Sequence, residues 1–107
     1  METKIINAGN CIIHFSNDKK VIIKQDLSEH AISKRSFLLL ELLNENIGEV
    51  VSTEKILTEI WCSNTYWNSR SMDVFITKLR NILNVGTNLK IIRVRSVGVK
   101  LIINYKS

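Results

Sequence analysis

The chain of 107 residues contains no proline, and its four glycines are isolated from one another. Isolated glycines cannot form the glycine-rich loop that cradles a phosphate, so a nucleotide-binding site of that kind is not indicated. No apolar run reaches about 18 residues, the length of a membrane-spanning helix. The first residues also lack the pattern of a secretory signal. The sequence therefore indicates one domain, which we expect to lie in the cytoplasm.

Cysteine and histidine are also scarce. The two cysteines, Cys11 and Cys62, are far apart and lack Cys-x-x-Cys spacing, and a single disulfide is not expected in a cytoplasmic chain. His14 and His30 show no metal-ligand spacing, and no motif marks a nucleophilic serine or cysteine. We therefore expect no metal, no cofactor and no catalytic activity, with both thiols buried or incidental.

The net charge of +5 is unevenly distributed along the chain. Residues 70–107 carry eight Lys or Arg and one acid, Asp73, a net charge of +7, whereas residues 1–69 carry −2. A concentrated positive field attracts polyanions, so the last third of the chain is the candidate surface for such a partner. Charge alone is equally consistent with basic side chains that merely keep this end solvated.

Short apolar or β-branched runs near the N-terminus predict strands. They are Ile5–Ile6, Cys11–Phe15 and Val21–Ile23, with a further short strand around His30–Ile32. The segments 7–10 and 16–18 are rich in turn-forming residues and separate the runs. Residues 1–32 are therefore predicted to form an N-terminal antiparallel sheet.

Capping residues and apolar spacing predict three helices within residues 33–86. Ser33 resembles the N-cap of the first helix and Gly48 its stop, and Ser52-Thr53 begins the second. Ser69 is predicted to cap the third helix, which ends near Val85-Gly86. The expected buried residues are Leu39, Leu40, Leu43 and Ile47, with Phe37 at the edge, in the first helix; Ile56, Leu57, Ile60 and Trp61 in the second; and Met72, Ile76, Leu79 and Leu83 in the third.

Two further runs, Lys90–Arg95 and Val99–Asn104, predict a β-hairpin within residues 90–104. Its turn is Ser96-Val97-Gly98, with Gly98 free to adopt a positive φ. A sheet, three helices and then a basic hairpin is the order of an α+β winged helix-turn-helix. We predict that residues 1–107 form a single domain of this fold.

The third predicted helix has a second, polar face opposite its apolar one. That face carries Arg70, Val74, Thr77, Lys78 and Asn81. Cations, hydrogen-bonding groups and a small apolar residue are what phosphates, base edges and a thymine methyl require in a major groove. Asp73 and Arg80 lie off this stripe, and we expect one of them to pair with a neighbouring element instead of contacting DNA.

The predicted hairpin also carries cations. Strand alternation directs Ile92 and Val94 to one face and Arg93 and Arg95 to the other, and Lys100 lies on the returning strand. An arginine-bearing tip suits the narrow minor groove of A·T-rich DNA. The alternative is an ordinary hairpin with a solvated basic face, which the neighbouring basic helix makes less favoured.

Aromatic residues lie just before the third helix. Trp61 falls on an apolar helix stripe and is expected in the core. A polar loop from Cys62 to Asn68 is predicted next, and its residues Asn64, Tyr66 and Trp67 form a candidate partner surface. The two aromatic residues could instead pin the loop to the domain, and the sequence leaves both interpretations open.

The chain also resembles the winged-helix effector domain of OmpR/PhoB-type response regulators. The matching segments are IGEVVSTEKILTEIW, RSMDVFITKLRNIL and IIRVRSVGVKLI, in the family's order. The resemblance implies DNA contacts by Arg70, Val74, Thr77 and Lys78 on the helix and by Arg93 and Arg95 on the wing. It also implies contact by the 63–69 loop with RNA polymerase in some members, and tandem copies on direct repeats.

Some positions depart from the family pattern. The wing usually reads Arg-Gly-x-Gly-Tyr, whereas here Ser96 replaces the first glycine and Val99 the aromatic. Ser36 stands where the first helix usually has a glutamate, and Phe75 occupies a position that often contacts DNA but here can pack instead. The phosphate-accepting receiver domain is absent, so we expect either a fragment of a longer regulator or a lone effector domain.

The predicted function is sequence-specific binding of duplex DNA as a transcriptional effector domain, without catalysis. The first alternative is a protein-interaction module that uses the basic face and the 63–69 loop. The second is an RNA-binding winged helix, although the deep, narrow major groove of duplex RNA excludes a helix.

Overall fold

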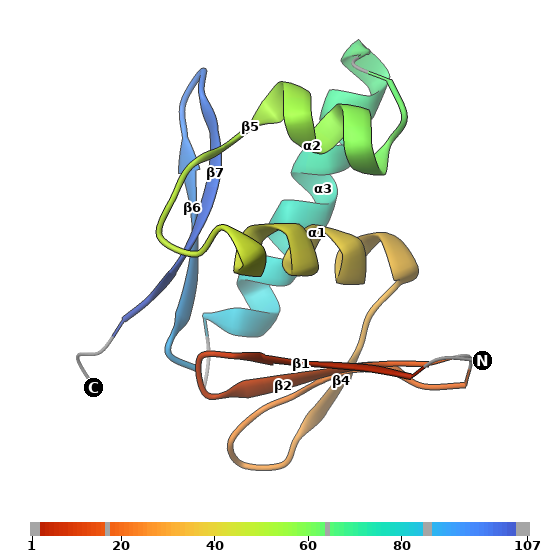
Figure 1. Ribbon diagram of the computed structural model, residues 1–107, viewed down its shortest axis with the longest axis vertical. Helices are drawn as coiled ribbons and strands as arrows, with labels where there is room; N and C mark the ends of the chain where they lie inside the picture. Colours follow the sequence, from red (N-terminus) through yellow and green to blue (C-terminus); the bar gives the residue numbers. More distant parts are fainter. Residues whose placement is uncertain (1–2, 17, 64, 85–86, 105–107) are drawn as a thin grey trace.

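The computed structural model describes residues 3–16, 18–63, 65–84 and 87–104, and it has the predicted order of strands, helices and hairpin (Figure 1). The elements are β1 (Lys4–Ala8), β2 (Cys11–Phe15), β3 (Lys20–Ile23), β4 (Glu29–Ala31), α1 (Lys34–Glu45), β5 (Val51–Ser52), α2 (Thr53–Ile60), α3 (Tyr66–Leu83), β6 (Leu89–Val94) and β7 (Gly98–Ile103).

The N-terminal sheet is antiparallel, and its strands follow the chain order β1-β2-β3-β4. Its two central strands alternate between core and solvent, as a sheet with one buried face requires. Ile13 and Ile22 are paired across β2 and β3 and are both fully buried, whereas Ile12 is exposed. The sheet lies below α1 in Figure 1, and α1 separates it from α2.

Two of the three predicted helix caps are confirmed. The Ser33 hydroxyl accepts a hydrogen bond from the Ser36 amide, and the Ser52 hydroxyl accepts one from the amide of Lys55. The predicted apolar stripe of α1 is wrong at its ends. Phe37, expected at the edge, is fully buried, while Ile47 lies beyond the end of α1 at Glu45 and is 38% exposed.

The predicted start of α3 is wrong. The N-cap is Thr65, whose hydroxyl accepts a hydrogen bond from the Asn68 amide at 3.1 Å. Ser69 lies inside the helix, where its amide donates to the Thr65 carbonyl. Tyr66 and Trp67 therefore belong to the first turn of α3 and not to a loop. Both Thr65 and Ser69 are residues that cap helices well, and only the path of the chain distinguishes them. The predicted end at Val85-Gly86 lies outside the described residues.

The C-terminal hairpin is part of a three-stranded sheet with the order β5-β7-β6. The two residues of β5 were not predicted as a strand, because so short a segment has no periodicity to read. Val51 pairs with Val99, so β5 joins the start of α2 to the wing. Strands β6 and β7 each begin and end one residue earlier than predicted.

The turn of the wing has a different geometry from the predicted one. The residue with a positive φ is Ser96, at 63°, and not Gly98. Ser96 thus adopts the left-handed conformation that usually favours glycine. Gly98 is needed for another reason, since a Cβ at this position would lie 2.0 Å from the carbonyl oxygen of Val51. The absence of a side chain therefore allows β5 to pair with β7.

Two asparagines hold the base of the wing to the N-terminal sheet. The Asn10 amide donates to Oδ1 of Asn88 at 2.9 Å, and the Asn88 amide donates to Oδ1 of Asn10 at 3.1 Å. Between them a Cβ on Gly9 would come within 2.3 Å of the Asn88 side chain. This reciprocal pair links segments 78 residues apart and fixes the wing relative to the body of the domain.

Candidate nucleic-acid interface

The two faces of α3 are divided as predicted between core and solvent. Its apolar residues Met72, Ile76, Leu79 and Leu83 are all buried. All five residues predicted for the opposite face are exposed: Arg70, Val74, Thr77, Lys78 and Asn81. The side chain of Val74 is 53% exposed, so this apolar group is available to a partner and not to the core.

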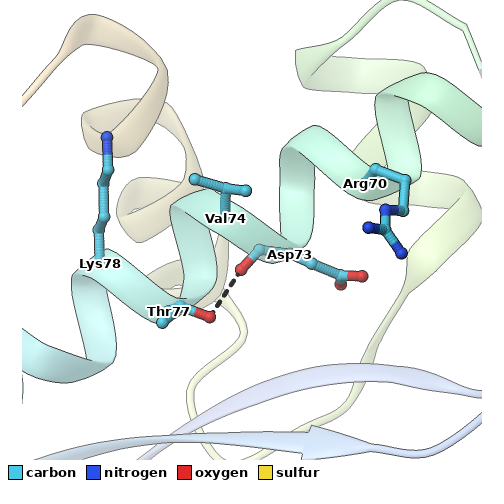
Figure 2. Close-up of a pocket in the computed structure, with 5 residues that line it drawn as sticks. All are labelled: Arg70, Asp73, Val74, Thr77 and Lys78. Carbon is cyan, nitrogen blue, oxygen red and sulfur yellow. Dashed lines mark hydrogen bonds between the residues drawn. The ribbon is translucent and has the colours of Figure 1, made fainter.

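Four of these five residues line one open groove together with Asp73 (Figure 2). The Thr77 hydroxyl donates a hydrogen bond to the carbonyl of Asp73, one turn earlier, at 2.9 Å. This local bond holds the threonine in place, and its oxygen can still accept a hydrogen bond. Lys78 extends away from the hairpin strands at the other side of the helix. The groove thus presents a cation, a methyl-bearing side chain and a hydroxyl in consecutive turns.

Asp73, the acid that lines this groove, forms an ion pair with the wing. A carboxylate oxygen of Asp73 accepts a hydrogen bond from the Arg93 guanidinium. This confirms the expectation that either Asp73 or Arg80 pairs with a neighbouring element. The pairing compensates a negative charge that would otherwise repel phosphate, and it joins α3 to β6.

Strand pairing places the wing cations on different faces. Arg93 is opposite Val99, and its face of the hairpin includes the buried Ile91 and Leu101. Lys100 is opposite Ile92, on the outer face. The predicted alternation of Ile92 and Arg93 is confirmed, but it is Arg93 that lies on the face packed against α3.

Arg95 occupies the tip of the wing and is exposed. The tip is held by hydrogen bonds from the Val97 amide to the Val94 carbonyl at 3.0 Å and from the Thr53 amide to the Val97 carbonyl at 3.1 Å. The second bond ties the tip to the first residue of α2. The wing therefore presents Arg95 from a turn anchored at two points.

Trp61 lies in the core, as predicted, and is 6% exposed. Its indole N–H donates to the Ser71 hydroxyl at 3.2 Å, and its ring meets that of Phe75 edge to face, with centroids 5.7 Å apart. Phe75 thus packs, as its sequence position allowed. Two cations contact these rings from outside: Arg35 lies over Trp61 at 5.1 Å and Lys78 over Phe75 at 5.8 Å.

The aromatic residues at the start of α3 remain on the surface. Tyr66 is 65% and Trp67 77% exposed, and their rings meet edge to face with centroids 5.1 Å apart. They contact each other and do not pin the preceding segment to the core. Asn64, the third residue of the candidate partner loop, lies outside the described residues.

Among the described residues, no group of three or more His, Cys, Asp or Glu side chains is placed to hold a metal ion. Burial raises the pKa of the Cys11 thiol, while Cys62 is exposed, and neither forms a disulfide. None of the described helices has the length and apolar character needed to cross a membrane.

Comparison with known proteins identifies the family. Residues 16–101 match the model of the family described as "Transcriptional regulatory protein, C terminal". The chain is 36% identical over 88 residues to the transcriptional regulatory protein RprY of Bacteroides fragilis, covering 82% of this chain and 37% of that protein. It is 33% identical over 89 residues to PhoB of Rhizobium meliloti, covering 74% and 39%. The chain thus spans about two fifths of the length of these relatives.

Solved structures confirm the fold. The DNA-binding domain of Klebsiella pneumoniae RstA, in complex with the RstA box, superimposes with a TM-score of 0.70 at 23% identity, covering 92% of this chain and 97% of that one. The chain therefore belongs to the family of C-terminal domains of transcriptional regulatory proteins, with the winged-helix fold of the OmpR/PhoB type.

Proposed function

We propose that this domain binds duplex DNA sequence-specifically as the effector domain of a transcriptional response regulator. Helix α3 would lie in the major groove and the wing would reach the neighbouring minor groove. The observation that carries the proposal is the exposed face of α3. Arg70, Val74, Thr77, Lys78 and Asn81 all face solvent there, beside a wing that ends in an exposed arginine.

The side chains divide into two groups by what they would contact. Arg70, Lys78 and Arg95 are cations that bind phosphates, which supply much of the affinity but no sequence information. Val74, Thr77 and Asn81 are uncharged and would face base edges. The asparagine amide suits adenine, and the methyl groups of valine and threonine suit the methyl of thymine. Sequence choice would therefore come from the middle of α3.

The other two predicted wing cations receive different roles. Arg93 is engaged by Asp73 on the face of the hairpin packed against α3. We assign it to holding the wing at a fixed angle to α3. Lys100 lies on the outer face, opposite Ile92. There it can add a phosphate contact at the rim of the interface.

The proposal includes partners beyond DNA. A single small domain buries only a modest interface, so tight binding requires two copies on repeated half-sites. The exposed pair Tyr66 and Trp67 offers an aromatic surface beside the DNA-reading helix, and we assign it to contact with RNA polymerase. Such a regulator would act in the cytoplasm, where the chromosome of a bacterium lies.

The first test is binding to random-sequence duplex DNA, measured by fluorescence anisotropy across a salt series. About four to six phosphate contacts predict a log–log slope on the order of −3 to −6. Lys78→Ala and Arg95→Ala should each make the slope less negative by about 0.9. Lys90 is an exposed cation at the base of the wing, and Lys90→Gln serves as the control because it also removes one positive charge.

Two outcomes would contradict the proposal. Unchanged affinity in both Lys78→Ala and Arg95→Ala would remove the assignment of these faces to DNA. Equal competition by duplex RNA would favour the RNA-binding alternative, because a helix cannot enter the deep, narrow RNA major groove. If binding survives both tests, selection from a random library should then identify the preferred half-site.

A further inference from the structure

Two cations lie on the first turn of α1, outside the basic last third of the chain. Lys34 and Arg35 are both exposed. Within the described part of the chain neither takes part in an ion pair. The acids of α1, Glu41 and Glu45, come about two turns later, so the cations are not compensated locally.

The structure links one of these cations, Arg35, to α3 through two aromatic rings. Arg35 lies over the ring of Trp61, Trp61 meets Phe75 edge to face, and Lys78 lies over Phe75. The distances are 5.1, 5.7 and 5.8 Å, so two rings in edge-to-face contact lie between the two cations. A cation–π contact of this kind holds a flexible side chain over a ring, and the side chain keeps its positive charge. Arg35 of α1 and Lys78 of α3 are therefore connected through Trp61 and Phe75.

A shallow hollow connects the same two helices. It is lined by Ser33 and Ser36 at the start of α1 and by Phe75 and Lys78 of α3. In Figure 2 the side chain of Lys78 extends towards this end of α1 and away from the hairpin strands. The wing contacts the other side of α3, where Arg93 meets Asp73. Helix α3 is thus flanked by cations on both sides.

The geometry of B-DNA gives this arrangement a function. The major groove is about 12 Å wide and a helix with its side chains is about 10–12 Å across. A helix lying in the groove therefore has a phosphate strand on either side. The wing can reach only the strand on its own side of α3. The strand on the far side needs cations from another element.

We propose that Lys34 and Arg35 bind the phosphates of the DNA strand that borders the major groove on the side away from the wing. This rests on the proposed function, because it places α3 in the major groove. The contact surface then continues from the wing across α3 to α1. Ordering of Arg35 by Trp61 gives this distant contact a defined position instead of a diffuse charge.

The experiment measures the salt dependence of binding to duplex DNA for the whole chain. The double variant Lys34→Gln/Arg35→Gln should make the slope of log K against log [salt] less negative by up to about 1.8, from two lost phosphate contacts. Lys90→Gln is the matched control, since it removes an exposed cation from the outer base of the wing and should leave the slope unchanged. Arg35→Lys keeps the positive charge and should also leave the slope unchanged.

Lys34→Gln alone keeps the test valid if loss of Arg35 loosens Trp61, and far-UV circular dichroism and thermal unfolding monitor the fold. An unchanged slope in Lys34→Gln and in the folded double variant would overturn the inference. If Lys78→Ala still makes the slope less negative in that case, the DNA-binding function stands and only its extension to α1 fails. A wild-type chain that does not bind DNA at any salt concentration would overturn both.

Discussion

Lys78 and Leu79 are neighbours in α3, yet they belong to opposite faces of the helix. Leu79 is fully buried with Met72, Ile76 and Leu83, whereas Lys78 is exposed beside Val74 and Thr77. A buried face is fitted to one set of neighbours, so a change there alters stability. An exposed face contacts few neighbours in the domain, so a change there alters binding. In α3, the residues that stabilise the fold and the residues proposed to bind DNA thus lie on different faces.

In the wing, the packed and solvated faces are less completely separated than in α3. One face of its hairpin packs on the body through Ile91 and Leu101, and the other is partly solvated. Arg93, however, is a charged side chain on the packed face, where it meets Asp73. From Met72 onward, the two faces of α3 differ in chemistry. In the wing the packed face is chemically mixed, because the charged Arg93 lies opposite the buried Val99.

The largest expected effect comes from the adjacent pair in α3. Leu79→Ala should lower the free energy of unfolding by about 2–5 kcal/mol, because it leaves a cavity in the core. Lys78→Ala should lower it by less than about 1 kcal/mol, since it removes one exposed cation–π contact. Urea denaturation measures both values. Similar losses in the two variants would show that the faces are not separated.

A smaller loss is expected inside the wing. Gly98→Ala should destabilise the domain by about 1–3 kcal/mol, because the added Cβ overlaps the carbonyl of Val51 and forces β5 from β7. Ser96→Gly, in the same turn, should not destabilise it, because glycine adopts a positive φ without strain. Thermal unfolding of the two variants compares them. Full stability of Gly98→Ala would contradict the close approach of the two strands.

The start of α3 provides a third comparison. Thr65→Ala should cost about 1 kcal/mol, because it removes the side chain that accepts from the Asn68 amide. Ser69→Ala should be neutral or slightly stabilising, since alanine is the better helix former inside a helix. Chemical denaturation distinguishes the two positions. The reverse order would restore Ser69 as the cap and return Tyr66 and Trp67 to a loop.

The smallest effect concerns the ion pair between α3 and the wing. A double-mutant cycle with Asp73→Ala and Arg93→Ala should give a coupling energy of about 0.2–1 kcal/mol, because both side chains are partly exposed. If Arg93 positions the wing, both single variants should weaken DNA binding to a similar degree without a change in salt slope. A less negative slope in Arg93→Ala alone would instead make Arg93 a phosphate contact.

Much of the fold was predictable from local patterns. The apolar spacing of α3 predicts its buried face residue by residue, because a helix repeats every 3.6 residues. Ser33 and Ser52 were identified as caps from their position before an apolar run. Strand β5 could not be found this way, since its two residues matter only when Gly98 is beside them. Thr65 was missed because the first turn of α3 is polar and aromatic, without an apolar stripe to mark its start.

The candidate site was predictable only in part. The exposed residues of α3 follow from its periodicity, and an ion pair for either Asp73 or Arg80 was expected from their angle on the helix. The partner, Arg93, was not identified, because its distance from Asp73 depends on how β6 packs on α3. Lys34 and Arg35 were not selected either. They lie far from Lys78 along the chain, and the contacts through Trp61 and Phe75 that connect Arg35 to Lys78 exist only in the folded domain.

The sequence by itself determined which faces of the elements are apolar, which residues of α3 face solvent and where positive charge is concentrated. These properties follow from side-chain chemistry and from the fixed periods of helix and strand, which act over a few residues. The tertiary structure decided which cations lie side by side, which face of the hairpin packs inward and why Gly98 lacks a side chain. Those outcomes depend on contacts between segments distant in the chain, and no local period encodes them.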